Sequence, residues 1–203
     1  MKKTMLLLCD DIRMNSGIST MAREIALGTL HKYRIVNIGG AIKHPEAGKV
    51  VDMSAAAAQA TGVSDAYLKI YPIDGYGNED ILFAIMAAEK PDVIMHFTDP
   101  RFWEFLYRLE RQIRSKIPLV FLNIWDSNPI CMYNRSLWEN SDLLMSISKQ
   151  TMNLNKWVLR PENCCAINGH YDKDTGNLVP WQVNEFVPDT AAVAHLKSEL
   201  VVA

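Results

Sequence analysis

Polar residues stand directly after several apolar segments of this sequence, at positions where a buried strand would pass into a loop. In an open α/β sheet, ligands bind beyond the carboxyl ends of the strands, so these positions are the first candidates for chemistry. A purely structural loop does not require so many carboxylate, hydroxyl and imidazole groups. The residues are Asp10, Asp11, Ser16, Gly17, Gly39, His96, Thr98, Asp99, Trp125, Asp126 and Asn128.

The loop after the first apolar segment ends in Ser16-Gly17 and leads into a segment with helical periodicity. A glycine at the start of a helix lets a phosphate approach free backbone N–H groups, and the helix dipole favours an anion there. Under the alternative interpretation, Gly17 makes a tight turn and Ser16 caps the helix. The sequence contains neither G-x-G-x-x-G nor G-x-x-x-x-G-K, which argues against dinucleotide-binding and P-loop sites.

The second group, His96 with Thr98 and Asp99, stands at the end of the apolar segment 93–97. A histidine at a strand end could act as a base or bond a sugar hydroxyl. It could equally be a buried, hydrogen-bonded core residue, and Asp99 could simply cap the helix that follows. The sequence leaves these interpretations open.

The third group is Trp125, Asp126 and Asn128, just before Pro129. Tryptophan and aspartate occur together where sugars bind, because the ring stacks on the apolar face of the sugar and the carboxylate accepts hydrogen bonds from hydroxyl groups. In the alternative interpretation, Trp125 packs under a loop and Asp126 starts a turn.

Other kinds of site have weaker support. Cys164-Cys165 with His170 has neither the usual zinc spacing nor a fourth ligand, so we expect no metal site. The sequence has no G-x-S-x-G elbow of a serine hydrolase. The four cysteines do not form the framework of a secreted disulfide protein, which predicts a reducing, cytoplasmic location.

Apolar segments alternate with helical periodicities along the first 160 residues. Strands are predicted at 4–9, 33–38, 93–97, 118–124 and 143–147, and helices at about 18–31, 79–89, 101–115 and 149–159. This alternation predicts an α/β, Rossmann-like domain over 1–160, with a doubly wound, mainly parallel sheet and helices on both faces.

Two regions are less regular. Between 41 and 73 we expect a short strand at Val50-Val51, a small helix or loop at 55–60, and a strand at 67–73. The remainder, 161–203, predicts a hairpin with its turn at 172–177, a linker-like segment and a terminal helix near 191–201.

Composition excludes several classes of protein. The chain has 203 residues, of which 49% are hydrophobic and 22% charged, so it has the composition of a globular protein rather than a disordered one. The net charge of -2 gives no basic excess for binding nucleic acid. The wholly apolar runs are far shorter than the about 20 residues that a membrane-spanning helix needs.

The order of these motifs resembles a known family. Ser16-Gly17-Ile18-Ser19-Thr20, then Lys90-Pro91-Asp92-Val93-Ile94 leading into His96, and then Trp125-Asp126, Tyr133-Asn134 and Ile147-Ser148-Lys149 follow one another as in the N-terminal domain of GT-B glycosyltransferases. The retaining, family-4 type is the most similar subgroup. The segment 179–188 resembles the approach to that family's interdomain linker, so the resemblance covers most of residues 4–188.

The resemblance implies an enzyme that transfers a sugar from a nucleotide-sugar donor to a hydroxyl-bearing acceptor with retention, without a metal or other cofactor. It implies that Ser16 and Gly17 approach the donor phosphates and that Asp126 acts as a catalytic residue beside the transferred sugar. The acceptor side would be lined by His96, Thr98 and Asp99. We further expect Trp125 and Asn128 to bind substrate.

The sequence departs from this family in lacking the donor domain and its characteristic pair of glutamates. We therefore expect the acceptor-side half of an enzyme, completed by a second chain or by self-association. An alternative is a non-catalytic domain that binds a carbohydrate or nucleotide, or docks on a partner chain. A receiver-like regulatory domain, indicated by Asp10-Asp11 and a phosphoacceptor at Asp52, is a further alternative.

Overall fold

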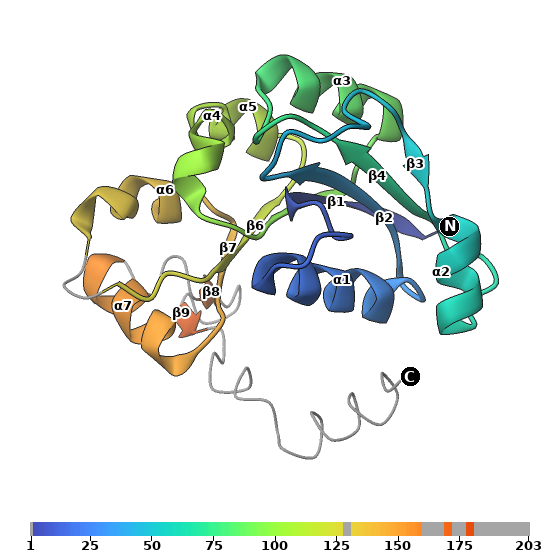
Figure 1. The fold of residues 1–203 in the computed structure, drawn as a ribbon. Helices are drawn as coiled ribbons and strands as arrows, with labels where there is room; N and C mark the ends of the chain where they lie inside the picture. Colours follow the sequence, from blue (N-terminus) through green and yellow to red (C-terminus); the bar gives the residue numbers. More distant parts are fainter. Residues whose placement is uncertain (1, 128–130, 160–168, 172–177, 181–203) are drawn as a thin grey trace. The chain divides into compact units, whose positions relative to one another are not determined.

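The structure is a computed structural model that describes residues 2–127, 131–159, 169–171 and 178–180 (Figure 1). The chain divides into two compact units, Met1–Leu119 and Val120–Ala203, and each is described by itself. The turn predicted at 172–177 and the terminal helix predicted near 191–201 lie outside the described residues.

The first unit is built on a mainly parallel sheet. Its strands are β1 (Lys3–Asp10), β2 (Tyr33–Gly40), β3 (Val51–Asp52), β4 (Leu68–Pro72) and β5 (Val93–His96). They lie in the order β3-β4-β2-β1-β5, and all pairs are parallel except β3 with β4. Beyond β5, Ile94 donates a backbone hydrogen bond to Pro118 at 3.0 Å. This arrangement confirms the predicted α/β class.

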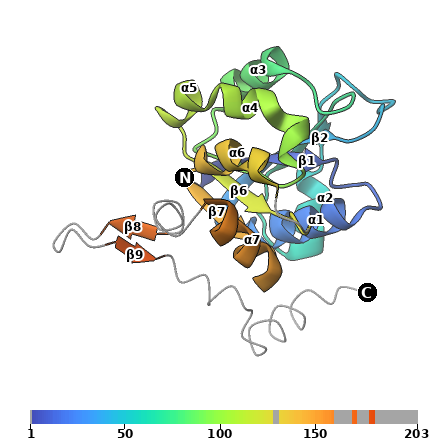
Figure 2. The same cartoon turned by 90° about the vertical axis from the view of Figure 1, so that its left-hand side faces the viewer.

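Helices cover both faces of this sheet. Figures 1 and 2 show α1 (Gly17–Thr29) and α2 (Ser54–Thr61) on one face, and α3 (Glu79–Glu89), α4 (Glu104–Arg108) and α5 (Glu110–Arg114) on the other. The central strand β1 is therefore enclosed from two sides, and Leu6, Leu7, Leu8 and Cys9 have no exposed surface. An unbroken apolar run is what such a doubly covered parallel strand requires.

The end of β2 comes very close to two loops. A Cβ added to Gly39 would lie 2.8 Å from the Cα of Asp11, and one added to Gly40 would lie 2.5 Å from the carbonyl oxygen of Gly75. Only residues without a side chain fit there. The Gly39-Gly40 pair thus allows the loops after β1 and β4 to meet at the carboxyl edge of the sheet.

The segment 101–115 differs from its prediction as one continuous helix. The structure divides it into a 3-10 turn, η1 (Pro100–Trp103), followed by α4 and α5, with Leu109 at φ -92° and ψ 5° between the two helices. Trp103, Leu106 and Tyr107 are buried. Packing these large side chains takes precedence over a straight helix, so the prediction of one continuous helix is wrong.

The second unit contains a smaller parallel pair, β6 (Leu119–Asn123) and β7 (Leu143–Ser146), with η2 (Met132–Asn134), α6 (Arg135–Glu139) and α7 (Lys149–Leu159). Buried amides fix its strand ends: Asn123 donates to Asn155 at 2.6 Å, and Asn155 donates to Ser146 at 2.9 Å. The strands β8 (Gly169–Tyr171) and β9 (Leu178–Pro180) form an antiparallel pair around the predicted turn. Among the described residues, no helix is long and apolar enough to cross a membrane.

Candidate functional site

A buried carboxylate lies at the carboxyl edge of the first unit's sheet. Asp10 ends β1, is 7% exposed, and accepts hydrogen bonds from two hydroxyl groups that come from different loops. Ser16 Oγ donates to its Oδ2 at 2.9 Å, and the Tyr76 hydroxyl donates to its Oδ1 at 3.3 Å. Three chain segments therefore converge on one carboxylate at the edge where α/β proteins bind ligands.

Tyr76 is a residue that the sequence did not single out. It lies between Gly75 and Gly77, both left-handed with φ of 59° and 74°, in the turn before α3. Burial, and then the negative charge of Asp10, raise the pKa of Tyr76 to about 12, although a hydrogen bond with Thr98 acts in the opposite direction. The hydroxyl therefore stays protonated and remains a donor at neutral pH. Its two flanking glycines are the signal in the sequence that could have identified it.

Aromatic rings extend this site towards solvent. The Tyr76 ring stacks on Phe102, with centroids 4.7 Å apart and planes inclined by 2°, and its edge contacts Trp103 at 5.8 Å. Phe102 is 51% exposed, whereas Trp103 is buried. We call Asp10, Ser16, Tyr76, Thr98 and Phe102 the strand-end cluster. It combines a carboxylate, hydroxyl groups and an exposed ring face.

Gly17 begins α1 beside this cluster. Ser16 caps the helix, because its Oγ accepts a hydrogen bond from Ser19 N at 3.0 Å, as one of the two interpretations predicted. A Cβ added to Gly17 would meet nothing within 4 Å. The first turn of α1 carries no acidic residue. The space around Gly17 at the helix start is thus open to an approaching group. The carboxylate of Asp10 lies next to this helix start, hydrogen-bonded to Ser16.

His96 is enclosed in the core. It has no exposed surface, and its Nδ1 lies 2.7 Å from the Tyr107 hydroxyl. Desolvation lowers its pKa from 6.5 to about 3, so the imidazole is neutral at physiological pH. This environment is the buried, hydrogen-bonded one that the sequence left open, and contact with substrate stays a prediction.

Asp99 takes part in a local cap. Its carboxylate accepts from Arg101 N at 2.9 Å and pairs with the Arg101 guanidinium at 2.5 Å. Burial alone would raise the pKa of Asp99, but these contacts with Arg101 hold it below its usual value. Thr98, 2% exposed, is brought to the strand-end cluster, whereas Asp99 starts the turn at Pro100.

Trp125 and Asp126 belong to the second unit, where they follow β6. The rings of Trp125 and Tyr133 pack edge to face, with their centroids 6.0 Å apart. The backbone N–H of Trp125 donates a hydrogen bond to Asn123 Oδ1 at 3.0 Å. Asp126 is exposed, and its backbone carbonyl accepts from Gln150 at 3.1 Å. Asn128 lies outside the described residues. A role for these residues in catalysis or binding stays a prediction.

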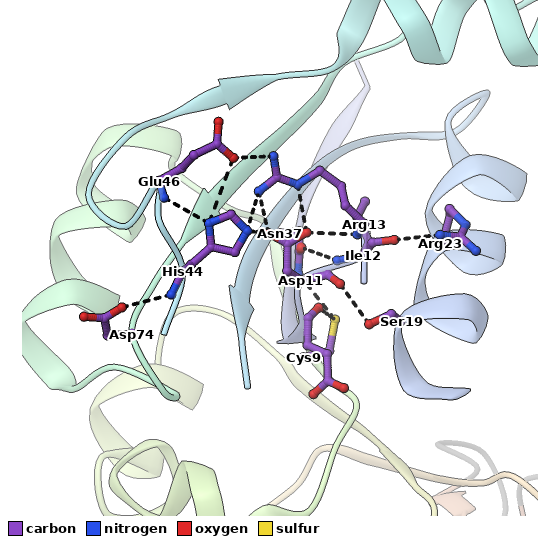
Figure 3. A network of polar contacts seen from close by, with 11 residues as sticks. Cys9, Asp11, Ile12, Arg13, Ser19, Arg23, Asn37, His44, Glu46 and Asp74 are labelled. Atoms are coloured by element: carbon purple, nitrogen blue, oxygen red, sulfur yellow. Dashed lines mark hydrogen bonds and ion pairs between the residues drawn. The ribbon is translucent and has the colours of Figure 1, made fainter. Parts of the chain in front are cut away.

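Asp11, next to Asp10, has a different environment (Figure 3). Its side chain is fully buried and pairs with Arg13 at 2.7 Å, and Arg13 also pairs with Glu46 at 2.8 Å. His44 Nε2 lies 3.5 Å from the same carboxylate. Burial raises the pKa of Asp11, but the hydrogen bonds and charge of Arg13 outweigh it and keep the pKa low. The network ties the loop after β1 to the loop after β2.

The expected phosphoacceptor of a receiver is not supported by the geometry, and Cys164 and Cys165 lie outside the described residues. Asp52, the expected phosphoacceptor of a receiver, is exposed on the edge strand β3 rather than at the end of a central strand, which argues against that alternative. Within the described part of the chain, no group of three or more histidine, cysteine or acidic residues could hold a metal ion. Burial raises the pKa of the Cys9 thiol, so it stays protonated and is a poor nucleophile.

Comparison with known proteins found no family model that matches this sequence, and no match among the curated proteins. A function must therefore be inferred from the residues and their geometry. The strand-end cluster of the first unit is the best-formed candidate, because it brings a carboxylate, hydroxyl groups and aromatic rings together at the carboxyl edge of the sheet.

Proposed function

We propose that this chain is the acceptor-side half of a retaining glycosyltransferase, which transfers a sugar from a nucleotide-sugar donor to a hydroxyl group. The observation that supports this most is Asp10, a buried carboxylate that accepts hydrogen bonds from two hydroxyl groups. Such a group is chemically suited to a polyhydroxylated ligand. The exposed face of Phe102 suits the apolar face of a sugar ring.

The donor phosphates would approach the start of α1. The open space around Gly17 supports this proposal, because backbone N–H groups at a helix N-terminus can stabilise the negative charge that develops on a departing phosphate. Asp126 would act on the transferred sugar, with Trp125 and Asn128 binding substrate. A second Rossmann-like domain would hold the nucleotide.

A binding-only domain is the second candidate, and the environment of His96 favours it. An imidazole with a pKa of about 3 takes up no proton near neutral pH, so His96 cannot serve as a general base or acid there. In this case the strand-end cluster would hold a carbohydrate without transferring it.

The experiment follows nucleotide release from a panel of nucleotide sugars by the purified chain, with and without saccharide acceptors, alongside saccharide binding measured by NMR. Gly17→Leu should abolish release or donor binding without lowering the midpoint of thermal unfolding, since nothing lies within 4 Å of the added Cβ. Gly28→Leu, on the same helix and also in open space, is the matched control.

The outcomes separate the two candidates. Release that disappears in Gly17→Leu supports the transferase. Saccharide binding without release from any donor, even when the chain self-associates, supports the binding-only domain. If the folded chain neither releases nucleotide nor binds any saccharide, both candidates are wrong.

A further inference from the structure

A polar pocket lies at the amino edge of the first unit's sheet, at the opposite ends of the strands from the strand-end cluster. Residues near the starts of β1, β2 and β4 and at the end of α3 line it, and its volume is about 430 Å³. We call it the amino-edge pocket. Its charged lining residues are four cations, Lys2, Arg34, Lys69 and Lys90, and two acids, Glu89 and Asp92.

Glu89 is the buried acid of this pocket, and its partners come from the same unit. Its side chain is 6% exposed and accepts hydrogen bonds from the hydroxyls of Tyr67 at 2.7 Å and Tyr71 at 2.6 Å, while Lys69 Nζ lies 3.5 Å away. Burial acts to raise the pKa of Glu89, but these hydrogen bonds and the charge of Lys69 outweigh it and lower the pKa. Glu89 is therefore an ionised carboxylate whose charge is balanced by Lys69.

Asp92 and Lys2 also have partners. Asp92 Oδ2 accepts a hydrogen bond from the backbone N–H of Thr4 at 2.8 Å. Lys2 donates to the carbonyl oxygen of Leu30 at 2.8 Å and pairs with Asp65, which does not line the pocket. Two of the four cations of the pocket therefore remain without a carboxylate.

These two cations are Arg34 and Lys90. Within the part of the chain that the structure describes, neither side chain forms an ion pair or a hydrogen bond. The Arg34 guanidinium lies over the ring of Tyr67, 3.9 Å from its centre. An aromatic ring in this position holds the plane of the guanidinium and leaves its N–H donors available to an acceptor lying in that plane.

The charge of the pocket matches an oxyanion that carries more than one negative charge. The fork of N–H donors on arginine fits two oxygens of a phosphate, and lysine adds a second positive charge. A singly charged carboxylate would leave one of the two cations without a counter-charge. The pocket volume lies within the range of small-molecule sites, so there is also room for a substituent on the phosphate.

We propose that the amino-edge pocket binds a phosphate group, free or as the monoester of a small molecule, through Arg34 and Lys90. Tyr67 positions Arg34, because its ring carries the guanidinium while its hydroxyl is held by Glu89. The pocket shares no residue with the strand-end cluster. The proposal is therefore independent of the proposed glycosyltransferase function.

The test is isothermal titration calorimetry of the full chain with inorganic phosphate, glycerol 2-phosphate and glycerol, at about 0.15 M ionic strength to screen exposed charges. Both phosphates should bind once per chain, and glycerol should not bind. Tighter binding of glycerol 2-phosphate identifies a monoester as the ligand, and equal or weaker binding identifies free phosphate.

Two variants test the cations. Arg34→Gln and Lys90→Gln should each weaken phosphate binding about tenfold, because each removes a charge-assisted contact. Lys32→Gln is the matched control, since Lys32 is an exposed lysine just before β2 that does not line the pocket, and its binding should be unchanged. Far-UV circular dichroism establishes that each variant is folded.

A second measurement locates the phosphate, because the start of α1 is the other place in this unit where an anion could bind. Changes in ¹H–¹⁵N NMR spectra should appear at the Arg34 side-chain N–H groups and at the backbone amides of Thr4 and Lys90. Gly17→Leu, which tests the donor site of the proposed glycosyltransferase, should leave this binding intact. The two proposals therefore fail separately.

Three results would overturn the proposal. The first is the absence of saturable phosphate binding to the folded chain. The second is binding that both Arg34→Gln and Lys90→Gln leave unchanged, or that Lys32→Gln weakens equally, which would mean that phosphate is attracted only by the overall charge of this edge. The third is binding that Gly17→Leu abolishes, with NMR changes confined to the start of α1.

Discussion

The Tyr76 hydroxyl donates a hydrogen bond to Asp10 Oδ1 at 3.3 Å, across 66 positions of sequence. This contact joins the turn after β4 to the end of β1. The Gly39-Gly40 pair makes it possible, since any larger residue at the end of β2 would collide with one of the two loops. The strand-end cluster is thus assembled by strand order rather than by proximity in sequence.

Replacing Tyr76 by phenylalanine should lower the free energy of unfolding by about 1 kcal/mol. The stacked ring remains, while the buried carboxylate of Asp10 loses one of its hydroxyl donors. Urea unfolding measures the change. Tyr33→Phe is the control, because the Tyr33 hydroxyl, at the start of β2, has no hydrogen bond within the described part of the chain. Its free energy of unfolding should change by no more than about 0.5 kcal/mol. Equal values for the two variants would contradict this account of Asp10.

Gly40→Ala should be destabilising by about 1–3 kcal/mol, since the added Cβ forces two loops apart. The collision is with backbone, because the new atom would lie 2.5 Å from the Gly75 carbonyl oxygen. Gly28→Ala, in the last turn of α1 with nothing within 4 Å of the added Cβ, should instead stabilise the chain by about 0.5 kcal/mol. Chemical denaturation of both variants checks the opposite signs, and a neutral Gly40→Ala would show that the loops are not in contact.

The imidazole of His96 should remain neutral from pH 8 down to pH 5. Desolvation lowers its pKa from 6.5 to about 3, so the folded protein takes up no proton there while the unfolded chain does. Stability supported by this group is therefore complete above about pH 6.5 and declines as the pH falls towards 3. Long-range ¹H–¹⁵N NMR of the ring reports the protonation state directly. His31, which is exposed, serves as the internal comparison, and a His96 midpoint near that of His31 would contradict its burial.

Asp11 should make a separate, pH-dependent contribution to the stability of the folded protein, and this contribution changes at low pH. Its pKa is lower in the folded protein than in the unfolded chain, because Arg13 outweighs the effect of burial. Its contribution to stability is therefore full above about pH 4 and is lost as the pH falls through the folded value.

Thermal unfolding between pH 7 and pH 3 measures this effect. In Asp11→Asn the melting temperature should fall less steeply below pH 4 than in the original chain, even though the variant is less stable at pH 7. Glu24→Gln changes an exposed acid on α1 and should keep the original slope. Parallel curves for the original chain and Asp11→Asn would mean that the Arg13 pair does not persist in solution.

Local signals predicted most of the elements. Helical periodicity predicted α3 with its observed bounds. In the structure the helix begins after Asn78, whose Oδ1 accepts a hydrogen bond from Ile81 N at 3.0 Å, and ends at Lys90, which is left-handed with φ 48°. The break at Leu109 could not be predicted from periodicity, since it depends on how Trp103 and Tyr107 pack against distant strands.

The site was harder to predict, for a physical reason. The sequence placed polar residues at strand ends, but burial decides what each can do, and burial depends on elements far away in the chain. His96 and Thr98 are two residues apart, yet the first is held in the core by Tyr107 while the second reaches Tyr76. Tyr76 itself gave no signal other than its two flanking glycines.

The short strand β3 has a consequence for how copies of this chain can associate. It ends the first unit's sheet with two residues, Val51 and Asp52, and Asp52 is opposite Lys69 on β4. An edge with so few backbone groups and with charged residues is a poor template for the addition of a strand from another chain. Any chain that associates with this unit should therefore dock through side chains rather than extend the sheet at β3.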